Sequence, residues 1–143
     1  MTELLKMIHS MKKLYDHLCL HVMKKYQMTR SELDILLFLY NNPTFDSAKD
    51  IVEQRGLSKS HASMGIEKLI QDGYLKAIVD EHDKRKSHLL LQASAQKIID
   101  DGIQVQKQFS EILFQGFSKE EKELYQKLLK QIYQNIKEEE AKS

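Results

Sequence analysis

Residues 47–91 constrain the fold of this chain more than any other segment, because two helical patterns and a hairpin pattern follow one another within them. The first helical run starts at Ser47, a good helix N-cap, and ends at Gly56, which suits the left-handed conformation of a C-cap. Ser58 caps a second run, which Gly73 ends. The expected order is therefore helix, turn, helix.

A β-hairpin is expected directly after the second of these helices. Residues 74–79 and 87–91 are rich in β-branched, aromatic and long apolar side chains, which favour strands. Every residue between them, from 80 to 86, is charged or His, so the hairpin has a long polar tip. Helix, turn, helix and hairpin together predict a winged helix, a shape that places one helix in a DNA groove.

Long amphipathic helices are expected on both sides of this centre. Apolar residues recur at steps of three and four through about residues 3–25 and 93–137, with a break at Gly116. Capping boxes begin at Thr29 and at Ser118, and the charged tail from Glu138 is expected to fray.

These elements predict one mainly α (α+β) domain over residues 1–143, with a DNA-binding lobe at about 29–91. The terminal helices carry more apolar residues than so small a lobe can cover. An apolar stripe without a partner in its own chain is usually buried against a second copy. We therefore expect a homodimer with the terminal helices at its interface.

Composition narrows the class of protein. The net charge is only +1, so any basic surface must come from local clustering. The single Cys19 cannot form an internal disulfide, which suits a reducing compartment. No apolar run approaches the ~18 residues of a membrane span, and no signal-peptide pattern is present. We expect a cytoplasmic protein with no membrane partner.

No catalytic pattern is recognisable in the chain. A glycine-rich phosphate loop, a nucleophile elbow and a carboxylate pair at a strand end are all missing from the sequence. The His residues are scattered, without an evident partner for acid–base chemistry. We expect neither enzyme activity nor a cofactor.

At residues 29–91 the chain resembles the MarR family of bacterial transcription regulators, and the order of elements is similar over nearly its whole length. The resemblance is carried by Gly56-Leu57-Ser58 in the turn, by the spacing of Leu69 and Gly73, and by Asp83-Lys84-Arg85. The last of these matches the family's wing signature, an Asp two residues before an Arg. The resemblance implies a dimeric regulator, most often a repressor, that binds double-stranded DNA.

The chain departs from the family pattern at several positions. Gln92 and Ala95 stand where the family commonly has Thr and Gly, and Met64 stands where a basic residue is frequent. Gly65 stands where an apolar residue is usual, and it allows close approach either to DNA or to a neighbouring helix. These departures concern base recognition more than the fold.

DNA contacts are expected from the helix-turn-helix of residues 47–73, here called the reader, and from the hairpin tip. In the reader they are expected from its second helix, which follows Ser58. A helix N-terminus with small polar and basic side chains can accept phosphate oxygens and reach base edges. An Arg at a hairpin tip can enter the minor groove, and we expect Asp83 to pair with Arg85 and direct it. The predicted DNA-binding residues are Ser58, Lys59, Ser60, His61, Ser63, Met64, Lys68, Asp83, Lys84, Arg85 and Lys86.

Other side chains near these residues have different expected roles. A phosphate contact is also expected from His88. The opposite face of the second helix is expected to form core, through Ala62, Ile66, Leu69 and Ile70.

Two alternatives remain open. The near-neutral charge and Met64 are compatible with a protein-interaction module on a winged-helix scaffold. A redox or metal sensor would use Cys19, or His17 and His21, which are spaced i, i+4 but lack further ligands. The resemblance also implies a pocket for a small-molecule effector between the dimerisation helices and the DNA lobe, with His17, His21 and Tyr40 as candidates together with residues of the 95–113 helix.

Overall fold

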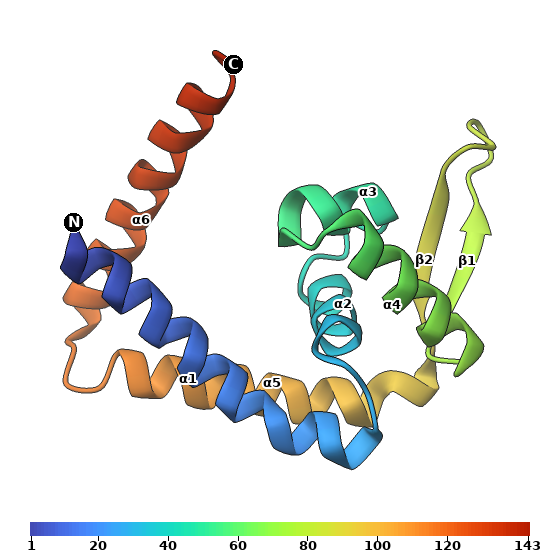
Figure 1. The fold of residues 1–143 in the computed structure, drawn as a ribbon, viewed down its shortest axis with the longest axis horizontal. Helices are drawn as coiled ribbons and strands as arrows, with labels where there is room; N and C mark the ends of the chain where they lie inside the picture. Colours follow the sequence, from blue (N-terminus) through green and yellow to red (C-terminus); the bar gives the residue numbers. More distant parts are fainter. The chain divides into compact units, whose positions relative to one another are not determined.

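The computed structural model describes residues 1–143, and Figure 1 labels their helices and strands. The chain divides into two compact units, Met1–Phe109 and Ser110–Ser143. The elements are α1 (Thr2–Tyr26), α2 (Arg30–Asn41), α3 (Ala48–Asp50), the π-helical turn η1 (Ile51–Arg55), α4 (Lys59–Gln71), β1 (Leu75–Val79), β2 (Ser87–Leu91), the 3₁₀ turn η2 (Ala93–Ala95), α5 (Gln96–Leu113) and α6 (Lys119–Glu140). The predicted mainly α winged-helix fold is confirmed.

Helix starts follow the capping residues of the sequence. Thr29, Ser47 and Ser118 each form a complete capping box, and Ser58 accepts a hydrogen bond from the backbone N–H of His61 over 3.1 Å. Gly56 has a φ of 81°, a conformation that favours glycine, and it ends the first helix of the reader. That helix leaves α-helical geometry for a π turn over its last five residues, a feature that the sequence pattern did not indicate.

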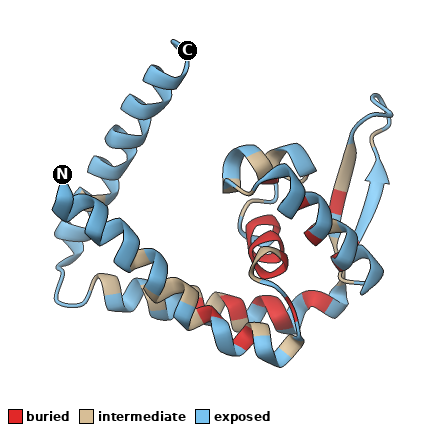
Figure 2. Ribbon diagram, in the orientation of Figure 1, coloured by how far each residue is buried: buried red, intermediate tan, exposed pale blue.

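The core of the first unit is built around α2. All residues from Glu32 to Leu39 are buried, and α4 lies on one side of the helix with α1 and α5 on the other (Figures 1 and 2). A Cβ added at Gly65 would lie 2.6 Å from Ile35 Cδ1, so glycine at this position allows α4 to approach α2 closely. Glycine at position 65 could have allowed close approach to DNA or to a neighbouring helix. The structure shows that it allows close approach to the neighbouring helix α2.

The wing is an antiparallel hairpin joined to the rest of the unit by backbone hydrogen bonds. Its register runs from Leu75 opposite Leu91 to Val79 opposite Ser87. The N–H of Leu89 donates to the carbonyl of Asp46 over 2.8 Å, which ties β2 to the loop before α3. The base of the wing is thus held close to the first helix of the reader.

Two details of the sequence prediction are wrong. Ile70 is 39% exposed instead of lying in the core, because α4 buries a narrower face through Ala62, Gly65 and Leu69. The charged tail is helical beyond Glu138, since α6 continues to Glu140 and Lys137 pairs with Glu140 at 2.7 Å.

The second unit consists mainly of α6, and none of the residues of this helix is buried (Figure 2). Its apolar residues recur at helical spacing and are exposed: Leu124, Leu128, Leu129, Ile132, Tyr133 and Ile136. The first turns of α1 in the other unit are similar, with Leu4, Leu5, Met7 and Ile8 about half exposed. Apolar stripes of this size usually have a partner surface.

No helix of the structure combines the length and the apolar character that crossing a membrane requires.

Candidate nucleic-acid interface

The exposed side of α4 carries every residue that the sequence predicted to lie there. Ser58, Lys59, Ser60, His61, Ser63, Met64 and Lys68 are all exposed. The helix begins at Lys59, and Ser58 caps the backbone N–H of His61 in its first turn. Lys68 differs from the others because its Nζ donates to Asp72 Oδ1 over 2.8 Å.

The tip of the wing is ordered by two aspartates. Asp80 Oδ1 accepts hydrogen bonds from the backbone N–H groups of His82 and Asp83, at 2.8 and 2.9 Å. Asp83 Oδ1 accepts from the backbone N–H of Arg85 over 3.0 Å and from its Nε over 3.4 Å. The Asp83–Arg85 pair expected from the sequence is therefore present, and it directs a guanidinium that is 93% exposed.

His88 has a different place from the one expected. Its Nδ1 lies 3.0 Å from both carboxylate oxygens of Asp46, and its Nε2 lies 2.7 Å from Asp80 Oδ2. Hydrogen bonds to Asp46 and then to Asp80 raise the pKa of His88, while the bond from His88 is the main cause that lowers the pKa of Asp80 to about 2. Because both ring nitrogens are occupied, His88 fastens the wing to the loop before α3 and is not free to contact phosphate.

The wing and the first helix of the reader border one open groove. It measures about 660 Å³ and is lined by residues 47–50 and Glu53 on one side and by Asp83, Arg85, Lys86, Ser87 and Leu89 on the other. The structure therefore brings the hairpin tip and the helix-turn-helix together on one surface.

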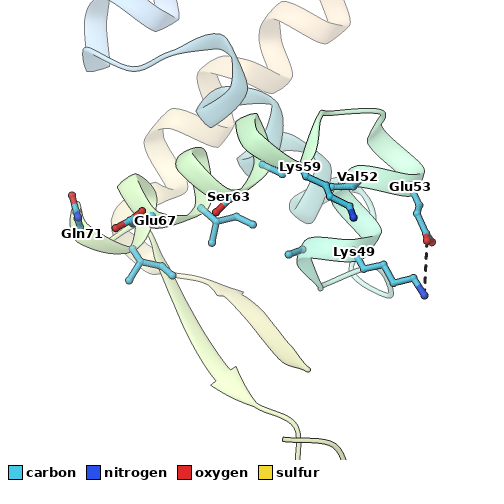
Figure 3. Close-up of a pocket in the computed structure, with 11 residues that line it drawn as sticks. Lys49, Val52, Glu53, Lys59, Ser63, Glu67 and Gln71 are labelled. Atoms are coloured by element: carbon cyan, nitrogen blue, oxygen red, sulfur yellow. Dashed lines mark ion pairs between the residues drawn. The ribbon is translucent and has the colours of Figure 1, made fainter. Parts of the chain in front are cut away.

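A second groove of about 910 Å³ runs between α3–η1 and α4 (Figure 3). Ala62, Ile66 and Ile70 contribute apolar surface to it, and Lys49 and Glu53 form an ion pair of 3.8 Å at its edge, marked by the dashed line. This groove accounts for the exposure of Ile70, which lines it.

A third cavity, of about 680 Å³, lies where α1, α2, η1 and α5 meet. Arg30 is its most connected side chain: it pairs with Asp16, donates to Asp34 Oδ1 over 2.9 Å, and lies 4.6 Å from the centroid of the Tyr15 ring. Arg55 reaches the same Asp34 oxygen at 3.2 Å. The sequence identified residue 30 only as part of a capping box, since its partners are contributed by other elements.

The effector candidates named from the sequence do not line this cavity. His17, His21 and Tyr40 are exposed and lie outside the set of residues that surround Arg30. The sequence also predicted that residues of the 95–113 helix line the pocket, and Gln106 and Phe109 of α5 do line this cavity. The cavity nevertheless occupies the position near the first, second and fifth helices where a pocket was expected.

Cys19 lacks the environment of a reactive thiol. It is fully buried, and burial is the main cause that raises its pKa. A thiol with a raised pKa is a poor nucleophile. The Nδ1 of His21 lies 3.0 Å from the carbonyl oxygen of Leu18 in its own helix, and no group of three or more His, Cys, Asp or Glu residues could hold a metal ion. These surroundings do not favour the redox or metal-sensing alternatives.

Comparison with known proteins gives concordant results. Residues 26–86 match the sequence profile of the MarR family. YybA of Bacillus subtilis (strain 168), described as an uncharacterised HTH-type transcriptional regulator, is 25% identical over 136 residues, which cover 95% of this chain and 90% of the relative.

Solved structures agree on the fold. A MarR protein from Peptoclostridium difficile superposes with a TM-score of 0.80 at 22% identity, covering 95% of this chain and 88% of the other. A complex of S. aureus MepR with DNA gives 0.70 at 20% identity, covering 94% and 96%. The winged helix and the terminal helices therefore belong to one shared architecture.

Proposed function

The chain is a member of the MarR family of transcriptional regulators, and from this premise we propose that it binds an inverted-repeat operator as a homodimeric, cytoplasmic repressor. One observation carries the proposal. Lys59 and Ser63 of α4 line one groove, and the directed guanidinium of Arg85 lines an adjoining one. Both grooves include Ala48, Lys49 and Glu53, so α4 and the wing tip belong to one helix-turn-helix-wing surface.

Helix α4 is suited to the major groove. A helix is the right width for that groove, and its N-terminal residues are the ones that contact base edges in this motif. The hydroxyls of Ser60 and Ser63 and the imidazole of His61 can hydrogen-bond to bases or phosphates, while Lys59 neutralises a phosphate. Ser58 is committed to capping the helix, so its contribution is the orientation of the first turn.

The wing is suited to the adjacent minor groove. Arg85 is held by Asp83 but remains almost fully exposed, so ordering it on DNA costs less conformational entropy than ordering a free side chain. Lys84 and Lys86 flank it without an ion pair of their own and can contact the phosphates on either side. The S. aureus MepR complex supports DNA binding by this fold, since that protein was solved with DNA.

The dimer follows from the uncovered apolar stripes. Helix α6 and the start of α1 expose rows of Leu, Ile and Met that a second copy would bury. Two-fold symmetry then presents two copies of α4, so half-sites about one DNA turn apart are expected.

An effector would act through the cavity beside Arg30. That cavity joins α1 to Arg55, which lies at the end of the first helix of the reader. A ligand there can release DNA only by binding better to a lobe arrangement that does not fit the operator.

The test is selection from a random duplex library with the purified full-length protein at near-physiological salt. Enrichment of an inverted repeat supports the proposal, and repression is then checked with that repeat cloned upstream of a reporter gene. A folded dimer that enriches no sequence, with and without candidate effectors, would overturn it and favour a protein-interaction module.

A further inference from the structure

Met64 is the most exposed large apolar side chain of the winged-helix lobe. It is 66% accessible, whereas Ala62, Gly65 and Leu69 of the same helix are buried. Exposed single apolar residues are common on protein surfaces, so exposure alone assigns no role. The role of Met64 is inferred from its position on α4 and from the residues beside it.

Met64 lies on the stripe of α4 that points furthest from the core. With about 3.6 residues per turn, the positions opposite the buried Ala62, Gly65 and Leu69 are Ser60, Met64, Glu67 and Gln71. Met64 is near the middle of this stripe. Glu67 and Gln71 also line the groove between α3–η1 and α4, whereas Met64 does not. The side chain thus faces whatever the helix itself docks against.

The other residues of this stripe carry groups that can hydrogen-bond to base edges. Gln71 can form paired hydrogen bonds with adenine, Glu67 can accept from the amino group of cytosine, and the Ser60 hydroxyl can pair with several edges. Ser60 Oγ also lies 4.0 Å from Met64 Sδ, a weak hydrogen bond between two residues of this stripe. Unlike these residues, Met64 has no strong hydrogen-bond donor or acceptor. A favourable contact of its side chain with DNA therefore requires an apolar group on a base.

The major groove offers one such counterpart. Among its base edges, only thymine presents an apolar group there, the C5 methyl. A thioether side chain is flexible and polarizable, so it packs well against a methyl group. We propose that Met64 is a specificity-determining residue that recognises a thymine in each half-site through this methyl. The inference rests on the proposed operator binding and names part of its sequence preference.

The experiment replaces thymine by deoxyuridine, which lacks only the C5 methyl and keeps every hydrogen bond. Each thymine of the selected operator is exchanged in turn, symmetrically in both half-sites, and the dissociation constant is measured by fluorescence anisotropy at constant salt. We expect one symmetric exchange to weaken binding about fourfold per half-site, the size of losing one buried methyl contact.

The variant Met64→Ala identifies the residue responsible. It should bind the thymine and deoxyuridine forms of that operator equally. The control Leu90→Ala, which removes an exposed apolar side chain outside the predicted DNA-binding residues, should keep the wild-type difference. Restoring the methyl as 5-methylcytosine, paired with guanine, should improve binding over plain cytosine for the wild type but not for Met64→Ala. Because Met64 and Leu90 are both exposed, both variants should unfold near the temperature of the wild type.

Two results would overturn the assignment while leaving operator binding intact: no thymine of the operator responds to loss of its methyl, or Met64→Ala still discriminates. Failure to enrich any operator would overturn the proposed function and this inference together. The two failures are therefore distinguishable.

Discussion

At the scale of single residues, the conformation of the wing tip is held by hydrogen bonds and not by burial of side chains. Arg85 is almost fully exposed, and only the carboxylate of Asp83 limits the directions that its guanidinium takes. The carboxylate also reduces the net charge of the tip, so its presence is better explained by orientation than by affinity.

Arg85→Ala should weaken specific operator binding without changing the dimer. An arginine that contacts bases in a groove contributes about 1–3 kcal/mol, so affinity should fall roughly 5- to 150-fold. Anisotropy titration at fixed salt measures the affinity, and light scattering measures the mass. Lys97→Ala is a matched control, because it removes one exposed positive charge at the start of α5. Equal affinities for the Arg85→Ala variant and the wild type would contradict the wing's role.

His88 should make the attachment of the wing depend on pH. Its pKa in the folded protein is raised above the ordinary 6.5, so its contribution to stability is complete below about pH 6.5 and is lost as the pH rises through the raised value. The pKa of Asp80 is lowered from 3.8 to about 2, so its contribution is present above about pH 3.8 and is lost as the pH falls towards 2.

The two contributions together favour the attached wing between about pH 4 and 6.5. Thermal unfolding at pH 5 and pH 8 should show a loss of stability at the higher pH, and His88→Gln should reduce that loss. His82→Gln serves as the control, because no hydrogen bond holds that exposed ring in the same hairpin. An unchanged pH dependence in the His88 variant would mean that other groups are responsible.

At the scale of elements, glycines decide how closely the helices of the first unit approach. A Cβ at Gly102 of α5 would lie 2.6 to 3.1 Å from three atoms of the buried Leu37 side chain in α2. Such distances are too short for carbon atoms, so the leucine would have to move within a full core.

Gly102→Ala should therefore destabilise the protein. Overpacking costs about 1–3 kcal/mol, and the higher helix propensity of alanine offsets only about 1 kcal/mol of it. Urea unfolding measures the change. In a Leu37→Val background, which shortens the opposing side chain, the same substitution should be neutral or stabilising. Equal effects in both backgrounds would show that the two residues are not in conflict.

At the scale of the whole molecule, the apolar stripe of α6 has no partner within its own unit. A helix of 22 residues with no buried side chain gains little from packing inside that unit. Its stability is expected to come from a second copy.

Removing residues 118–143 should yield a monomer or an aggregate, and so should the pair Leu128→Asp and Ile132→Asp on the apolar stripe. The truncation removes the apolar stripe, and the two Asp substitutions would bury charges without partners in the dimer interface, which costs more free energy than the interface can supply. Size-exclusion chromatography with light scattering gives the mass. Lys130→Asp, on the polar side of the same helix, should remain dimeric. A well-behaved dimer of the truncated chain would place the interface elsewhere.

The sequence by itself determined where most helices, turns and strands of this protein lie, with the π turn η1 as an exception. Capping boxes at Thr29 and Ser118, the glycines after the helices, and the polar tip at residues 80–86 all act within a few residues of the chain, so their effects can be read locally. The Asp83–Arg85 pair was predictable for the same reason, since the two residues are neighbours in the hairpin tip.

Only the tertiary structure decided the partners of residues that are far apart in sequence. His88 meets Asp46 across 42 residues, and Arg30 meets Asp16 across 14. The face of α4 that is buried, and hence the exposure of Ile70 and the tight contact at Gly65, depends on how closely α2 approaches. Periodicity identifies an apolar face but not its width, because that width is set by the shape of the opposing helix.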